Sequence, residues 1–147
     1  MDISQLNVGD TLTSPEWFQL KQQTINDFAH ATGDFQWIHL DNERCKQQSP
    51  FKTTIAHGFL TAALMPKMFA QCVSIDDSKV TMLNYGIDTL RYLEPVRVND
   101  KIRFVFSLSD IEKKPMGNLH KFNTSVEIEG REKPALIGDF LMLVIAK

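Results

Sequence analysis

The residue types that can perform chemistry are concentrated between Gly33 and Met68. Asp34 precedes His39 by five residues, and Gly58 opens a long apolar run. A carboxylate and an imidazole that act on one point form a general acid/base pair, with ordinary pKa values of about 3.9 and 6.5. On an α-helix this spacing would turn the two side chains about 140° apart. We therefore expect a loop to bring Asp34 and His39 together.

Gly58 adds a third component to this candidate site. The first N–H groups of a helix have no partner within the helix and lie at the positive end of its dipole. A glycine there lets a ligand carbonyl approach the backbone, as an oxyanion site requires. Each residue also has a structural interpretation: Asp34 as a turn residue, His39 as a partner of the backbone, and Gly58 as a tight junction. Their joint occurrence favours an active site.

The elements that must position these residues can be read from the spacing of apolar side chains. Apolar residues at helical spacing predict a helix over residues 22–32, with Gly33 as its C-cap. A short helix is expected over 42–48, with Asn42 as its N-cap. Between these helices, Phe35, Trp37 and Ile38 are expected to hold the loop against the core.

The run from Gly58 to about Val73 is apolar on nearly every face, which predicts a long helix buried all round. Pro66 lies inside it, and the clash of its ring with the preceding turn predicts a kink or an early end. Residues 11–20 indicate a strand interrupted near Pro15. After Asp77 the pattern changes to strands over 80–98, bent near Gly86, and over 101–111, 120–129 and 135–145.

These elements predict an α+β fold of about five antiparallel strands curled around a long central apolar helix. Without repeats or linkers, residues 1–147 are expected to form a single domain. His30 is expected on the solvated face of its helix and His120 on a strand edge. The two cysteines, Cys45 and Cys72, have no metal-ligand spacing and give no disulfide framework.

The composition limits the classes of partner. The net charge of −2, with acidic and basic residues interleaved, argues against binding to nucleic acid or to an anionic membrane. No stretch is long and apolar enough to span a bilayer, and the beginning of the chain lacks the pattern of a signal peptide. We therefore expect a cytoplasmic protein.

The candidate site carries a family resemblance. Gly33-Asp34-x-x-x-Ile38-His39-x-Asp41, followed by Ile55-Ala56-His57-Gly58-Phe59-Leu60-Thr61, resembles the MaoC-like, R-specific enoyl-CoA hydratase branch of the hotdog superfamily. The resemblance continues through Asn84-Tyr85-Gly86 and the turn over 95–100. Asp-x-Gln-Trp-Ile-His, together with Asn-Tyr-Gly, is most similar to the nodulation protein N-like members.

This resemblance implies a hotdog fold, a homodimer, and interconversion of trans-2-enoyl-CoA and (R)-3-hydroxyacyl-CoA, with the coenzyme A thioester as substrate and no cofactor or metal. It implies that Asp34 and His39 hold and activate water and that the Gly58 N–H polarises the thioester carbonyl. Gln36 and Trp37 stand where the hydratase motif has Asn-Pro. The substrate-binding residues expected from the resemblance are Gln36, Trp37, His57 and Phe59.

Three other interpretations remain open. A thioesterase of the same fold usually has a carboxylate on the central helix, but residues 59–73 contain none. A metal site could draw ligands from His30, Asp34, His39 and Asp41. A non-catalytic hotdog protein that binds acyl thioesters would retain the same fold. Pro66 also replaces a serine that lies near the site in some hydratases.

Overall fold

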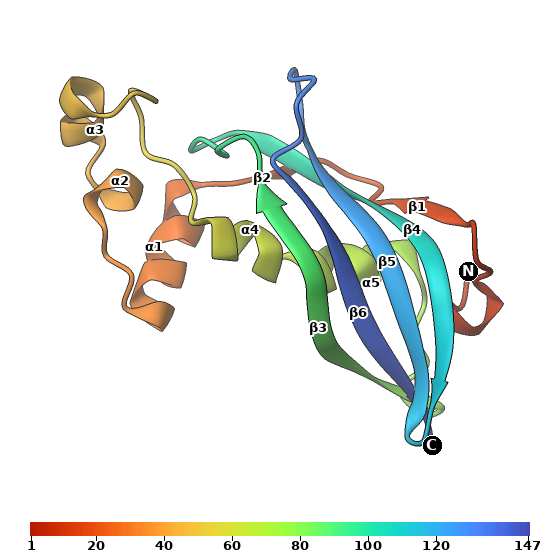
Figure 1. The fold of residues 1–147 in the computed structure, drawn as a ribbon. Helices are drawn as coiled ribbons and strands as arrows, with labels where there is room; N and C mark the ends of the chain where they lie inside the picture. Colours follow the sequence, from red (N-terminus) through yellow and green to blue (C-terminus); the bar gives the residue numbers. More distant parts are fainter.

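The computed structural model describes all residues from 1 to 147 and contains one antiparallel sheet (Figure 1). The strands are ordered β1-β4-β5-β6-β3, and β2 also pairs with β4. The sheet therefore ends at β3, which has a partner on one side only. The strands are β1 (Thr11–Thr13), β2 (Phe18–Gln19), β3 (Val80–Tyr92), β4 (Lys101–Lys114), β5 (Gly117–Ile128) and β6 (Leu136–Ala146).

The helices precede β3 along the chain and lie at one end of the sheet or behind it (Figure 1). No helix is both long and apolar enough to cross a membrane. The helices are a 3-10 turn (Ile3–Gln5), α1 (Gln22–Thr32), α2 (Trp37–Leu40), α3 (Asn42–Gln48), α4 (Gly58–Ala63) and α5 (Met65–Cys72).

The core lies between the sheet and α5. Phe69 of α5 packs edge-on against Phe106 of β4 and Phe122 of β5, with ring centroids 5.3 and 4.9 Å apart. Buried residues alternate along β4 and β5, so one face of the sheet covers the helix. Each of these phenylalanines contributes about 1.5–3 kcal/mol through its burial. The predicted packing of a sheet around a central helix is therefore present.

The predicted central helix is divided into α4 and α5 at Leu64. Pro66 then lies in the first turn of α5, where its missing N–H leaves no hydrogen bond unmade. The expected burial on all faces is wrong for the single chain. Phe59 is 72% exposed, and Ala63 and Pro66 are exposed on the same two helices.

Of two helix caps predicted from the sequence, one is confirmed and the other is wrong. Gly33 ends α1 with a left-handed backbone, φ 81°, as predicted. The N-cap of α3 is Asp41 rather than Asn42, because the Asp41 carboxylate accepts a hydrogen bond from the Arg44 N–H at 3.0 Å. This places the acidic side chain at the positive end of the helix.

The irregularity expected in β3 near Gly86 occurs between Asn84 and Gly86. The prediction for His120 is wrong, because β5 lies between β4 and β6 and His120 is buried there.

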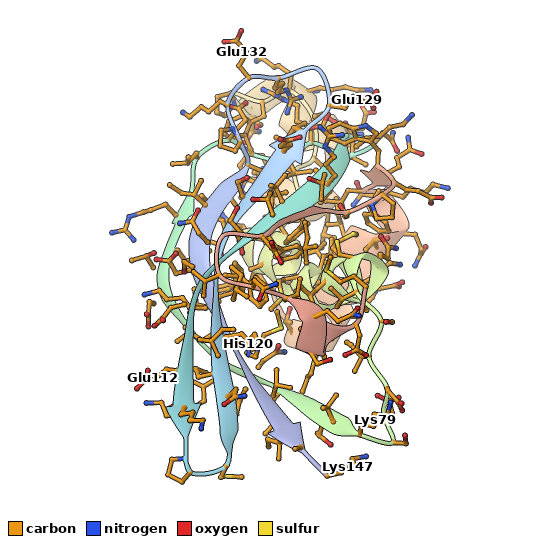
Figure 2. The ribbon with its side chains drawn as sticks, turned by 90° about the vertical axis from the view of Figure 1, so that its right-hand side faces the viewer. Lys79, Glu112, His120, Glu129, Glu132 and Lys147 are labelled. Carbon is orange, nitrogen blue, oxygen red and sulfur yellow. The ribbon has the colours of Figure 1, made fainter.

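Figure 2 shows Glu129 and Glu132 at the end of the sheet opposite Lys147.

Candidate active site

His39 is the buried member of the predicted pair. It lies on α2, is 6% exposed, and its Nδ1 is 2.7 Å from the carbonyl oxygen of Ile55. A carbonyl only accepts, so Nδ1 carries the hydrogen and the neutral ring keeps its lone pair on Nε2. Burial lowers the pKa of His39, an effect opposed by the bond to Ile55. The ring therefore has the form of a base.

Asp34 lies in the short loop between α1 and α2, and its side chain is 51% exposed. Its Oδ1 accepts a hydrogen bond from the Gln36 N–H at 3.3 Å. The structure brings it beside His39, since ligand-type atoms of Asp34, His39 and His57 all lie within 4.8 Å of one another. Phe35 does not hold the loop against the core as expected, because it is 53% exposed. His39 is the buried residue of α2, and its apolar neighbours are less buried.

His57 lies behind the pair, at the N-cap position of α4. Its Nε2 donates to the Asp34 carbonyl at 3.0 Å, and its ring stacks on His39 with centroids 3.8 Å apart. It is 2% exposed, and its Nδ1 is enclosed without a hydrogen-bond partner. His57 thereby connects the Asp34 loop, the His39 ring and the start of α4. These three segments are separate in the sequence and meet only in the folded chain.

A cavity of about 270 Å³ opens between His39 and the first turn of α4. Gly58 lies at that turn, and a Cβ there would come within 2.9 Å of the Tyr92 ring. The absence of a side chain at Gly58 thus lets the Tyr92 ring pack directly over this backbone at the edge of the cavity. The cavity is lined by His39, Ile55, Ala56, Gly58, Thr61, Tyr92, Leu93, Glu94, Pro95, Val96 and Ala135.

None of the four predicted substrate-binding residues, Gln36, Trp37, His57 and Phe59, lines this cavity. Gln36 is the N-cap residue of α2. Trp37 packs under the Arg44 guanidinium, which lies 4.2 Å from its ring centroid. Phe59 points outward with its ring edge-on to Tyr92.

Among the polar residues that line the cavity, the sequence did not identify Thr61, Tyr92 or Glu94 as site residues. Thr61 had a signal, because it is the only polar side chain of α4 and lies one helical turn after Gly58. No sequence signal pointed to Tyr92, because its position over Gly58 depends on where β3 ends.

The geometry would also allow a metal ion between Asp34, His39 and His57. His30 and Asp41, which the sequence suggested as ligands, are not in this cluster. One nitrogen of each clustered histidine is already bonded to a backbone carbonyl. A metal would therefore depend on His39 Nε2, His57 Nδ1 and one carboxylate oxygen.

Comparison with known proteins places this chain in a family. The model of the MaoC like domain matches residues 4–130. The 3-hydroxyacyl-thioester dehydratase Z of Mycobacterium tuberculosis is 38% identical over 139 residues, which cover 94% of this chain and 91% of that protein. Nodulation protein N of Rhizobium meliloti is 38% identical over 143 residues, covering 97% and 88%.

Solved structures have the same fold at low identity. The monoamine oxidase regulatory protein of Archaeoglobus fulgius has a TM-score of 0.82 and 22% identity, covering 100% of this chain and 95% of that one. An R-hydratase of Pseudomonas aeruginosa has a TM-score of 0.78 and 24% identity, covering 98% and 85%. The expected hotdog fold is confirmed, and the chain belongs to the MaoC-like domain family.

Proposed function

We propose that the protein is a hydratase/dehydratase that interconverts trans-2-enoyl-CoA and (R)-3-hydroxyacyl-CoA. The observation that carries this proposal is the free Nε2 of His39, which lies beside the Asp34 carboxylate and borders the same cavity as Gly58. The family relationship and the relatives' printed activities on hydroxyacyl thioesters support the reaction class.

The acid/base step follows from the tautomer of His39. Its Nε2 accepts a proton from water while the water oxygen forms a bond to C3 of the enoyl group. The double-bond electrons move toward the thioester, and C2 then takes one proton from the Asp34/His39 pair. Water is thus divided into the 3-hydroxyl and one C2 hydrogen, both delivered on the face of the substrate that meets the pair.

The developing enolate oxygen is assigned to the Gly58 N–H. This group belongs to the first residue of α4 and has no partner within the helix. Donors aimed at such an oxygen in a dry cavity contribute about 3–4 kcal/mol in acyl-transfer enzymes. The largest single contribution to catalysis is therefore expected here rather than at the acid/base pair.

We also propose a homodimer. Strand β3 forms one edge of the sheet and exposes Leu83 and Ile87, at 46% and 43%. Phe59 and Ala63 on the exposed face of α4 line an apolar hollow together with Ile87. A second copy would cover the helix face that the sequence predicts to be buried.

The test is a hydration assay with trans-2-enoyl-CoA substrates of short and medium length, following loss of enoyl absorbance and the chirality of the product. We expect the (R)-3-hydroxyacyl thioester. Asp34→Asn and His39→Ala should each lower kcat by at least about 100-fold, the scale of one acid/base group, while thermal unfolding shows folded protein. Thiol release without loss of enoyl absorbance would instead support a thioesterase.

A chelator provides the control for the metal alternative. Because the proposed step uses the free Nε2 of His39 as a proton acceptor and needs no metal, activity is expected to survive prolonged treatment with EDTA. Loss of activity that only added metal restores would replace the acid/base mechanism with a metal-assisted one.

A further inference from the structure

Thr61 is a buried residue whose hydroxyl has no hydrogen-bond partner in the protein. It is 3% exposed and lines the cavity together with His39 and Gly58. The only fully enclosed unpartnered side-chain polar atom is His57 Nδ1, so the small exposed part of Thr61 includes its hydroxyl oxygen. The hydroxyl therefore opens into the cavity.

The other buried threonines show how unusual this is within the molecule. Thr54 donates to the Gln22 side chain at 2.6 Å, and Thr124 donates to the Phe122 carbonyl at 3.1 Å. Thr32, on helix α1, donates to the carbonyl four residues earlier, the usual local solution for a helical threonine. Thr61 makes no such bond, although the His57 carbonyl is four residues before it. Its hydroxyl is left for a ligand.

The position of Thr61 identifies which part of a ligand it can meet. It follows Gly58 by three residues, so both lie on one face of α4, separated by about 4.5 Å along the axis. With a thioester carbonyl at the Gly58 N–H and the acyl chain directed along α4, C3, two bonds beyond the carbonyl carbon, would lie beside the next turn. The oxygen on C3 is then the polar atom nearest to Thr61.

The chemistry of the cavity supports the same contact. Ile55, Ala56 and Val96 form apolar walls, and a water or hydroxyl enclosed by such walls needs hydrogen-bond partners. A threonine hydroxyl both donates and accepts, so it can bond to an oxygen that gives up its proton elsewhere. His39 Nε2, which borders the same cavity, is the acceptor of that proton.

We propose that the Thr61 hydroxyl binds the oxygen added at C3: the attacking water in hydration and the 3-hydroxyl in dehydration. The inference rests on the proposed hydratase function and adds a third polar group to Asp34 and His39. Thr61 fixes the oxygen from the helix side while His39 removes its proton. No other helical hydroxyl lines this cavity.

The test compares two ligands that differ only in the 3-hydroxyl, (R)-3-hydroxybutyryl-CoA and butyryl-CoA, by calorimetric titration. In Thr61→Val, which keeps the shape of the side chain, affinity for the hydroxyacyl thioester should fall about tenfold, the weight of one hydrogen bond. Affinity for butyryl-CoA should change by less than about twofold. Thr61→Ser, which keeps the hydroxyl, should resemble the wild type, and Thr24→Val on α1 is the matched control.

Kinetics with crotonyl-CoA supply the second readout, where kcat/KM should fall about tenfold in Thr61→Val and recover in Thr61→Ser. Equal losses for both ligands, unchanged binding of both, or a wild type that does not distinguish them would overturn the assignment. If the ligands are distinguished through Thr61 but the wild type does not hydrate crotonyl-CoA, the proposed function fails and the binding contact stands.

Discussion

At the scale of single residues, the tautomer of His39 is determined by one backbone contact. Ile55 lies just before α4, and its carbonyl holds the proton on Nδ1, so the lone pair is on Nε2 without any charged partner at Nδ1. Electrostatic interaction with the neighbouring His57 ring adds a smaller effect that also lowers the pKa of His39. The protein thus keeps His39 neutral by burial and uses the backbone to select its tautomer.

A pH profile tests this state. Because burial lowers the pKa of His39 below 6.5, the base form is present at pH 7 and is lost only when the pH falls through the lowered pKa. We expect kcat/KM for hydration to decrease as the pH falls, with the midpoint of this acid limb below 6.5. The acid limb should disappear in the residual activity of His39→Ala.

The same pH range affects stability, so the folded fraction must be measured at each pH. The buried rings of His39 and His120 both have lowered pKa values, so the unfolded chain binds more protons below about pH 6.5 and stability decreases with falling pH. Circular dichroism separates this loss from titration of the site. A midpoint for the acid limb at or above 6.5 in folded protein would contradict the assignment.

The proximity of Asp34 and His39 could be predicted because their spacing rules out a shared helical face and Gly33 ends the preceding helix. The particular partners of His57 could not, since stacking on His39 and bonding to the Asp34 carbonyl depend on where α4 begins relative to α2. The pair of Asp34 and His39 could therefore be predicted from residues close in the sequence. Its contacts with His57 depend on tertiary packing.

At the scale of elements, features with a local sequence signal were again predicted, and features without one were missed. Helices α1 and α3 were predicted within their observed bounds because glycine, proline and polar caps mark their ends. The single turn of α2 was missed, since four residues carry too little periodicity to identify a helix. The break at Leu64 was placed near Pro66 because a proline disrupts the turn that precedes it.

The start of α4 yields a prediction about Gly58→Ala. The new methyl group would meet the end of the Tyr92 ring at about 3 Å, and that ring is 46% exposed and free to swing outward. We expect the free energy of unfolding to change by less than about 1 kcal/mol. Hydration kcat/KM should nevertheless fall at least about tenfold, because the displaced ring and the methyl alter the cavity beside the N–H.

Chemical denaturation and steady-state kinetics on the same preparation check both parts of this expectation. Tyr92→Phe serves as a comparison, since it keeps the ring over Gly58 and removes only the hydroxyl. If Gly58→Ala retained full kcat/KM, the assignment of the enolate oxygen to this helix terminus would be wrong.

At the scale of the whole molecule, the exposed apolar surface is unevenly distributed. Exposed large side chains gather on the free edge strand, at Leu83, Tyr85 and Ile87, and Phe59 lies on the nearby helix face. An edge strand with unpaired N–H and C=O groups and apolar neighbours is a site for pairing with another strand. The proposed dimer would bury the apolar face of the central helix that a single chain leaves exposed.

The dimer predicts a specific effect of charge on β3. Wild-type protein should sediment with twice the mass of the chain, and Leu83→Lys combined with Ile87→Lys should shift it to the monomer, because the charges oppose edge-to-edge pairing. Met116→Lys is the matched control: Met116 is 66% exposed, in the hairpin between β4 and β5, and its replacement should leave the dimer intact. A wild type that sediments as a monomer at micromolar concentration, or a double variant that stays dimeric, would show that β3 is not the interface.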